Sequence, residues 1–294
     1  MLAQQILNGL TLGGIYALIA VGYTMVYGII QLINFAHGEI YMLGAFLALT
    51  ALTALHLPFP VALLFGVAGC ALLGVAVDAV AYRPLRRAPR LSALITAIGV
   101  SIFLQNLARI LWGARTKSFP DEVIPALFKA TFVVGGVTVT ALQVFILAVV
   151  LALMLALRWI VLRTKMGRAM RACAQDLTCA QLMGVDVNRV VSFTFALGSA
   201  LGAVAGILIG VYYNAVYPMM GYRAGIKAFA AAVLGGIGNI PGAIAGAFIL
   251  GAAEALGAAY VSSLYRDGIA YAIMILFILF KPTGIMGKRT ETKV

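Results

Sequence analysis

The chain has 294 residues, of which 63% are apolar and only 10% are charged, and its formal net charge is +12. Soluble domains carry about 25% charged residues, so this composition excludes a water-exposed globular surface and favours a chain whose solvent is lipid. The cations lie in short clusters between long apolar runs, as membrane topology requires, and this distribution argues against a nucleic-acid-binding face.

Apolar segments occur along the whole chain, and a membrane span needs about 20 such residues. In chain order the segments are Ile6–Ile30, Gly38–His56, Pro60–Tyr82, Leu91–Trp112, Thr140–Leu162, Val190–Tyr213, Ala224–Gly238, Gly242–Tyr260 and Asp267–Phe280. The first has no basic residues before it and is too long for the apolar core of a signal peptide, so we expect a retained helix. The seventh is short enough to be a half-helix.

These segments predict an all-α fold, a polytopic integral membrane helical bundle of about eight or nine transmembrane segments with some helices broken or halved. No stretch between them is long enough for a separate soluble domain. We therefore expect one transmembrane domain over residues 1–294, with residues 163–189 as a cytoplasmic loop within it.

Lysine and arginine in short loops predict the orientation of the bundle. They form three clusters: Arg83, Arg86, Arg87 and Arg90; then Arg163, Lys165, Arg168, Arg171 and Arg189; and last Lys281, Lys288, Arg289 and Lys293. An even number of crossings separates each cluster from the next, so all three fit in the cytoplasm together with the C-terminus. The N-terminus then lies outside with nine crossings and inside with eight.

Small residues four apart predict close helix packing, because helices in lipid associate through near backbone approach. Three stripes have this spacing: Gly198, Gly202, Gly206 and Gly210; Gly238, Gly242 and Gly246; and Gly66, Cys70 and Gly74. A compact bundle follows from these stripes, whereas a transport pathway does not.

Polar residues break the apolar pattern between Gln31 and Glu39. We expect Asn34 to cap the next helix and Gly38 to permit an unusual backbone conformation. Irregular backbone at membrane depth is tolerated where it lines protein or a water-filled cavity. His37 and Glu39 are therefore candidates for a pathway lining or an internal lock, and an ordinary loop at the membrane surface fits the same residues.

A second break contains Gly235, Gly236, Asn239 and Pro241. Proline removes a backbone donor and the glycines loosen a helix, so this stretch indicates either two half-helices or a tight turn between two helices. We take Gly235, Gly236 and Asn239 as candidate gate residues together with those of the first break.

Four further charges lie within apolar segments: Asp78, Arg109, Lys227 and Glu254. We expect Asp78 to pair with the neighbouring arginine cluster and Arg109 to extend toward the interface. Lys227 and Glu254 lie on separate segments without a supporting chain of charges, so the sequence does not indicate a proton relay.

The polar stretch after Leu162 is long enough for two short helices. Asp176 is placed to cap the second helix and Gly184 to end it. That helix has an apolar side formed by Leu177, Ala180, Leu182 and Met183. A short exposed helix of this kind indicates a docking site for a partner protein, and a basic loop held by anionic lipid is the alternative.

Sequence signatures of catalysis are absent. The chain has no phosphate-binding loop, HExxH or GxSxG motif. Its two histidines offer little for a metal site, and its three cysteines do not form a disulfide framework. We therefore expect no enzyme activity and no cofactor bound by this chain. Energy for transport must come from another subunit or from a co-ion.

Three stretches of the sequence resemble the LivH-type permeases of branched-chain amino acid ABC transporters. They are GGIYALIAVGYTMVYGIIQLINFAHGEIYMLGAF from Gly13 to Phe46, RTKMGRAMRACAQDLTCAQLMGVDVNRV from Arg163 to Val190, and AAVLGGIGNIPGAIAGAFILG from Ala231 to Gly251. Their order and their spread over nearly the whole chain make the resemblance specific.

The resemblance implies an inner-membrane importer in which this chain pairs with a second, LivM-type permease. Two cytoplasmic ATPase subunits, which bind the ATP, and a periplasmic substrate-binding protein complete it. Gly167–Gly184 matches the segment that couples such permeases to the ATPases, which points to Gly167, Arg168, Arg171, Asp176, Ala180 and Gly184. The family carries leucine, isoleucine, valine and other neutral amino acids, and close relatives carry urea or short amides.

Two other functions fit the sequence less well. An ion-coupled secondary transporter requires a membrane-embedded carboxylate, for which Glu39 or Glu254 is available. A structural membrane subunit with charge relays would have to use Lys227 and Glu254.

Overall fold

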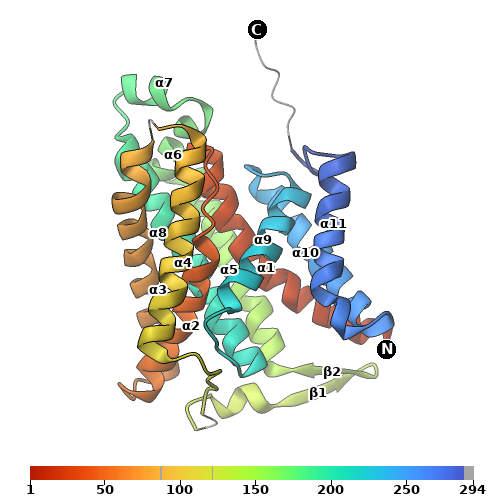
Figure 1. Cartoon of the computed structure of the whole chain (residues 1–294). Helices are drawn as coiled ribbons and strands as arrows, with labels where there is room; N and C mark the ends of the chain where they lie inside the picture. Colours follow the sequence, from red (N-terminus) through yellow and green to blue (C-terminus); the bar gives the residue numbers. More distant parts are fainter. Residues whose placement is uncertain (87, 121, 288–294) are drawn as a thin grey trace.

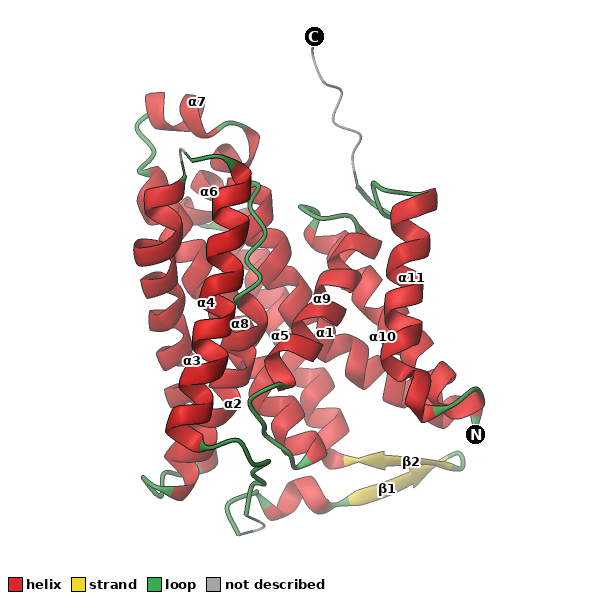
Figure 2. Ribbon diagram, in the orientation of Figure 1, coloured by secondary structure: helices red, strands yellow, loops and turns green. Residues whose placement is uncertain are grey.

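The computed structural model describes residues 1–86, 88–120 and 122–287, which fold almost entirely into helices (Figures 1 and 2). The long helices are α1 (Leu2–Ile30), α2 (His37–Thr53), α3 (Phe59–Val77), α4 (Arg90–Trp112), α5 (Ala141–Arg163), α8 (Val187–Tyr213), α9 (Met220–Gly235), α10 (Ile240–Tyr260) and α11 (Arg266–Phe280). Every apolar segment predicted from the sequence is one of these helices, and the all-α bundle is confirmed.

Short elements connect the long helices. They are α6 (Lys165–Gln175), α7 (Leu177–Leu182), a π-helical turn η1 (Asp78–Tyr82), the 3-10 turns η2 (Arg83–Leu85), η3 (Ala126–Lys129) and η4 (Ser263–Tyr265), and the strands β1 (Thr131–Val134) and β2 (Val137–Thr140). The two strands form an antiparallel hairpin in which Thr131 pairs with Thr140. This hairpin, in the loop before α5, was not expected from the sequence.

Within the described residues, 7 helical segments are long and apolar enough to cross a membrane. Helix α11 reaches that length only together with η4, over Ser263–Phe280, while α2 and α9 fall short with 17 and 16 residues. At the usual rise, α9 spans only about 24 Å. The predicted eight or nine segments are therefore an approximate count, in which two helices are too short to span lipid alone.

The two ends of the bundle differ in charge and structure. The start of α1 and the hairpin lie at one end, while α6 and α7 lie at the other (Figure 1). Arg86 Nη1 donates to Asn188 Oδ1 at 2.6 Å, so the first two arginine clusters meet at the end that carries α6 and α7. In the third cluster Lys288, Arg289 and Lys293 lie outside the described residues, as does Arg87 in the first.

Helices α1 and α8 form the buried centre, whereas α5 and α11 leave most of their apolar surface exposed, as a lipid-facing helix should. A Cβ at Gly206 would collide with the backbone carbonyl of Tyr41 on α2, and one at Gly74 would lie 2.8 Å from the carbonyl of Phe195 on α8. The predicted close packing at these stripes is therefore confirmed. The stripe that begins at Gly238 is partly wrong, since Gly238 lies in a turn with φ +91°.

Candidate functional site

The first break lies between α1 and α2, but Asn34 does not cap α2. Helix α2 begins after Ala36, without a side-chain cap. Asn34 Oδ1 instead accepts a hydrogen bond from the hydroxyl of Tyr82 at 3.0 Å, while its backbone carbonyl accepts from the N–H of His37 at 3.0 Å. The prediction fails because the Asn34 side chain turns away from the helix it precedes and toward η1.

His37 packs between α1, α2 and α8. Its ring lies edge-on to Tyr23, with centroids 4.9 Å apart. A Cβ at Gly198 or Gly202 would lie 3.6 Å from the ring, and one at Gly22 would clash with it. Glycines of α1 and α8 thus leave room for a buried imidazole that is 1% exposed. Its Nε2 has no hydrogen-bond partner among the described residues.

Gly38 brings the start of α2 against α9. A Cβ at this position would lie 2.9 Å from the Cα of Gly225, so no side chain fits between the two helices. Gly221, one turn earlier on α9, faces the same contact. Gly38 was expected to permit an unusual backbone conformation. In the structure its role is instead to let α2 and α9 approach each other, because it has no side chain.

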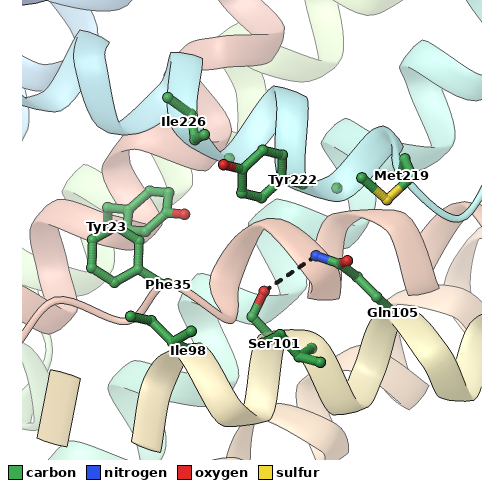
Figure 3. A pocket seen from close by; sticks show the side chains of 11 residues that line it. Tyr23, Phe35, Ile98, Ser101, Gln105, Met219, Tyr222 and Ile226 are labelled. Atoms are coloured by element: carbon green, nitrogen blue, oxygen red, sulfur yellow. Dashed lines mark hydrogen bonds between the residues drawn. The ribbon is translucent and has the colours of Figure 1, made fainter. Parts of the chain in front are cut away.

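Glu39, on the first turn of α2, is 1% exposed and is linked through its hydrogen-bond partners to the cavity between α4 and α9. Its Oε1 accepts hydrogen bonds from Ser101 Oγ at 3.1 Å and from Gln105 Nε2 at 2.7 Å. Its Oε2 has no hydrogen-bond partner among the described residues. Ser101 and Gln105 lie one turn apart on α4, and both line the cavity (Figure 3).

The cavity measures about 400 Å³ and its walls are mainly apolar and aromatic. Figure 3 shows these side chains around it. They are Tyr23, Phe35, Ile98, Ile102, Tyr222 and Ile226. Small-molecule sites typically combine such walls with a few placed polar groups in about 300–1,000 Å³, so this arrangement is a candidate site for a small, mainly apolar molecule.

The second break is a tight turn between two helices, not a gap between half-helices. Asn239 caps α10 by accepting from the N–H of Gly242 at 3.0 Å, and its Nδ2 donates to the carbonyl of Met286 at 2.8 Å. Gly236 has φ +106°, which favours glycine. The chain after α11 closes this turn, because the N–H of Met286 donates to the carbonyl of Gly235 at 3.0 Å.

The structure does not bring the two breaks into one site. Gly38 contacts α9 at Gly225, whereas Asn239 follows the opposite end of that helix. The ten residues from Gly225 to Gly235 cover about 15 Å of helix. Of the predicted gate residues, Gly38 and Glu39 contact residues that line the cavity on α9 and α4, and His37 lies against Tyr23, which also lines it. Asn34 hydrogen-bonds to Tyr82, which does not line this cavity.

A second cavity of about 290 Å³ lies on the other side of α9 and contains a charge network that the sequence analysis missed. Lys227 Nζ lies 2.9 Å from Glu254 Oε1 and 2.6 Å from Asp267 Oδ1, and Arg266 Nε lies 3.5 Å from Glu254 Oε1. The hydroxyl of Tyr16 donates to Glu254 Oε2 at 2.9 Å. The expectation that Lys227 and Glu254 lack supporting charges is therefore wrong.

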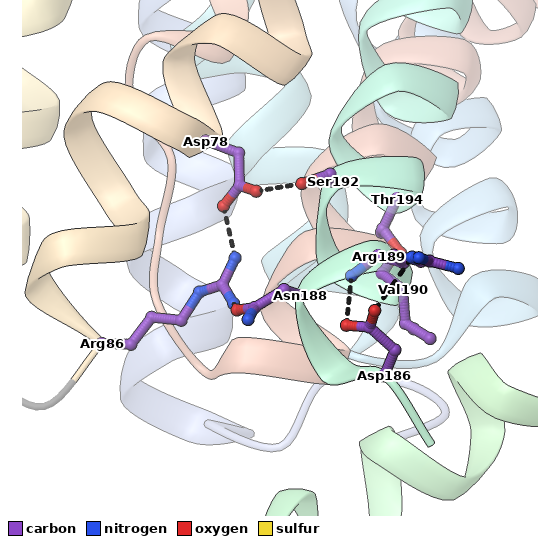
Figure 4. A network of polar contacts seen from close by, with 8 residues as sticks. All are labelled: Asp78, Arg86, Asp186, Asn188, Arg189, Val190, Ser192 and Thr194. Atoms are coloured by element: carbon purple, nitrogen blue, oxygen red, sulfur yellow. Dashed lines mark hydrogen bonds and ion pairs between the residues drawn. The ribbon is translucent and has the colours of Figure 1, made fainter. Parts of the chain in front are cut away.

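Asp78 pairs with the first arginine cluster, as expected. Arg86 Nη2 lies 2.7 Å from Asp78 Oδ1, and Ser192 Oγ donates to Asp78 Oδ2 at 2.6 Å (Figure 4). Ser192 is on α8, so the buried carboxylate joins the segment after α3 to the start of α8. Arg109, by contrast, is exposed near the end of α4, as a side chain that reaches the interface should be.

Helix α7 has the predicted capping residues, while α6 is capped by Thr164, which was not predicted. Asp176 accepts from the N–H of Cys179 at 2.8 Å, and this hydrogen bond holds the pKa of the exposed carboxyl below its ordinary value. Gly184, with φ +84°, follows the end of α7. Leu182 and Met183 are 82% and 83% exposed. Ala180, expected on the same apolar side, is only 4% exposed and faces the protein.

The other residues predicted in this segment attach α6 to α5. A Cβ at Gly167 would collide with the carbonyl groups of Ile160 and Val161. Arg171 Nη1 donates to the carbonyl of Val161, whereas Arg168 is exposed. The segment therefore combines a rigid attachment to α5 with an outward apolar surface on α7.

Comparisons with known proteins identify close relatives over nearly the whole chain. The family model described as "Branched-chain amino acid transport system / permease component" matches residues 5–278. The high-affinity branched-chain amino acid transport system permease protein LivH of Escherichia coli (strain K12) is 47% identical over 99% of this chain and 97% of its own length. The corresponding protein BraD of Pseudomonas aeruginosa is 46% identical over the same shares.

Among solved structures, PsaBC from Streptococcus pneumoniae in complex with Fab has a similar fold. The TM-score is 0.50 at 16% sequence identity, and the match covers 96% of this chain and 93% of that chain. At this identity the likeness concerns the fold alone.

Proposed function

Because the chain belongs to the family of permease components of branched-chain amino acid transport systems, we propose that its cargo is a branched-chain or other neutral amino acid. The chain is the permease subunit of an ABC importer and not an enzyme, and ATP hydrolysis takes place on separate subunits. It is a multi-pass membrane protein, in agreement with its helices and composition.

The coupling to the ATPase is assigned here to α6 and α7. The exposure of Leu182 and Met183 supports this proposal. Both are large apolar side chains, and both are more than four-fifths exposed at the basic end of the bundle. Exposed apolar side chains of this kind indicate a surface that a partner protein covers. Arg168 and Arg171 lie on the adjoining helix. Gly167 and Asp176 give the segment a defined shape, through tight contact with α5 and through the cap of α7.

The basic end of the bundle supports an orientation with α6, α7 and the C-terminus in the cytoplasm of a bacterial inner membrane. In that orientation the hairpin and the N-terminus face the periplasm, where a substrate-binding protein would deliver the amino acid. A second, LivM-type permease completes the membrane part, and two ATPase subunits bind below it. No role for nucleic acid is proposed.

The proposed transport cycle begins when ATP binding closes the ATPase dimer and moves α7. Helix α7 contacts α8, which packs along α2, so a shift of α7 reaches the start of α2. There, His37 locks α2 against α1 and α8, while Gly38 and Glu39 face α9 and α4. The bundle then switches from inward-open to outward-open, and the substrate passes between this chain and its partner permease.

One observation favours a second function. The network of Lys227, Glu254 and Asp267 supplies the buried carboxylate that an ion-coupled secondary transporter needs. Such a transporter would work without ATPase subunits, so dependence on ATP separates the two functions.

Co-purification of the subunits tests the coupling surface. The chain is expressed with the partner permease and ATPase encoded beside it and purified by a tag on this chain. We expect Leu182→Glu combined with Met183→Glu to abolish recovery of the ATPase and to spare the partner permease. Leu127→Glu, which alters an apolar residue that is 71% exposed at the hairpin end, should retain both. Full recovery of the ATPase with the double variant would exclude α7 as the docking site.

A further inference from the structure

Glu39 is a buried acid without a counterion. Its carboxylate accepts two hydrogen bonds on Oε1 and none on Oε2, and among the described residues no lysine or arginine lies within ion-pair distance of it. The other buried acids of the bundle, Asp78 and Glu254, each have a cation as partner. An unpaired buried carboxylate is costly, so its position beside a cavity indicates a cationic group that enters from outside the chain.

Gln105 shows how this charge reaches the cavity. Its Nε2 lies 2.7 Å from Glu39 Oε1 and 3.4 Å from Ser101 Oγ, so both acceptors hold the nitrogen of the amide on the Glu39 side. Because the amide is planar, its oxygen must then point elsewhere, and Gln105 lines the cavity (Figure 3). An amide oxygen only accepts hydrogen bonds. Gln105 can therefore present an acceptor to the cavity, with the carboxyl group of Glu39 behind it.

The remainder of the cavity restricts what accompanies the cation. Its walls include Phe35, Ile98, Ile102, Tyr222 and Ile226, which suit a branched hydrocarbon chain. Gly221 and Gly225 on α9 also line the cavity, but α2 packs against the faces where their side chains would be. A strongly hydrated metal ion would make no favourable contact with these apolar walls.

We propose that this cavity binds the ammonium group of a small apolar amine, with the amide oxygen of Gln105 as direct acceptor and Glu39 as the buried countercharge. The proposal rests on the proposed function and extends it, because a branched-chain amino acid carries both the ammonium group and the apolar branch. It assigns the permease a substrate site of its own, in addition to any selection that a binding protein makes.

Binding of a matched pair of ligands tests the proposal. The purified complex is placed in nanodiscs without ATP or binding protein, and saturation-transfer NMR compares 3-methylbutylamine with 3-methylbutanol, with empty nanodiscs as the blank. We expect the wild type to prefer the amine. Glu39→Gln should reduce that preference by roughly tenfold, because it removes the countercharge while the Gln105 acceptor remains, and an attraction between two charges a few ångströms apart within a protein amounts to at least one tenfold step in affinity.

Two further variants separate charge from structure. Gln105→Met keeps the length of the side chain but removes the acceptor, and it should also reduce the preference for the amine. If Glu39→Gln fails to fold, Gln105→Met alone tests the proposal. Thr24→Val removes a buried hydroxyl that has no hydrogen-bond partner among the described residues and does not line this cavity, so it should leave the preference unchanged.

An unchanged preference in the folded variants, or no preference for the amine in the wild type, would overturn the proposal. If the wild-type complex imports leucine with ATP in the same preparation, such a result would leave the permease function intact. Failure of the two proposals is thus distinguishable.

Discussion

Buried ions at the residue scale join helices that are far apart in the sequence. Lys227 on α9 contacts Glu254 on α10 and Asp267 on α11, while Tyr16 on α1 donates to Glu254. A buried ion pair repays its desolvation only when its hydrogen bonds are satisfied. Here both oxygens of Glu254 have partners, so the network is expected to hold the C-terminal helices on α1.

The losses from removing two members of this network should not add up. Lys227→Met leaves Glu254 as a buried charge whose remaining ionic partner, Arg266, lies 3.5 Å away, and we expect a loss of about 3 kcal/mol in the free energy of unfolding. Adding Glu254→Gln, which keeps an acceptor for Tyr16, should cost less than the sum of the single losses. Unfolding in mixed detergent measures both, with Arg158→Met, an exposed cation on α5, as control. Additive losses would contradict the account.

Sequence patterns located the polar residues but not their partners. Glu39 stood out because it follows a break in an apolar run. Ser101 and Gln105 are four apart in an apolar segment and thus share a face, which was a usable signal for a polar face on α4. Tertiary packing decides which helix this face contacts. The spacing of two residues within one helix carries no information about that contact.

At the element scale, glycine spacing determines how closely the helices approach. Gly206 on α8 faces the backbone carbonyl of Tyr41 on α2, whereas Gly99 on α4 has no atom within 4 Å of an added Cβ. The first glycine belongs to a packed contact and the second to an open surface, although both lie within helices.

Alanine at these two glycines should therefore have opposite effects. Gly206→Ala pushes α8 from α2, and overpacking of this kind costs about 1–3 kcal/mol. Gly99→Ala should be neutral or stabilise the helix by up to about 1 kcal/mol, because glycine is the poorer helix former. Thermal unfolding of the two variants in one detergent gives the comparison, and equal shifts in Tm would refute the packing argument.

Helix positions were predictable because a membrane span has a minimum apolar length and capping residues have a recognisable chemistry. The cap of α7 was predicted at Asp176, and Asn239, predicted only as a gate residue, caps α10 in the same way; each accepts from a backbone N–H three residues later. Asn34 has the same chemistry but binds Tyr82 instead. Local sequence cannot distinguish the two outcomes, because a tertiary partner competes with the cap.

At the scale of the whole molecule, the proposed coupling surface and the cavity are joined by a short series of packed helices. Helix α7 contacts α8, α8 packs along α2, and Glu39 on α2 contacts α4 at the cavity. The bundle and the end that carries α6 and α7 followed from apolar length and from lysine and arginine positions. The two cavities did not, because each is enclosed by residues of several helices.

ATP-driven uptake is the most direct test of the central claim, that this chain is the permease of an importer powered by separate ATPase subunits. The complex of this chain, its partner permease and the ATPase is reconstituted in liposomes with the binding protein outside and ATP inside, and radiolabelled leucine uptake is measured with and without an ionophore. The account predicts uptake that requires ATP and persists when the ionophore collapses every ion gradient. Uptake by this chain alone, without ATP and abolished by the ionophore, would contradict it and establish an ion-coupled transporter.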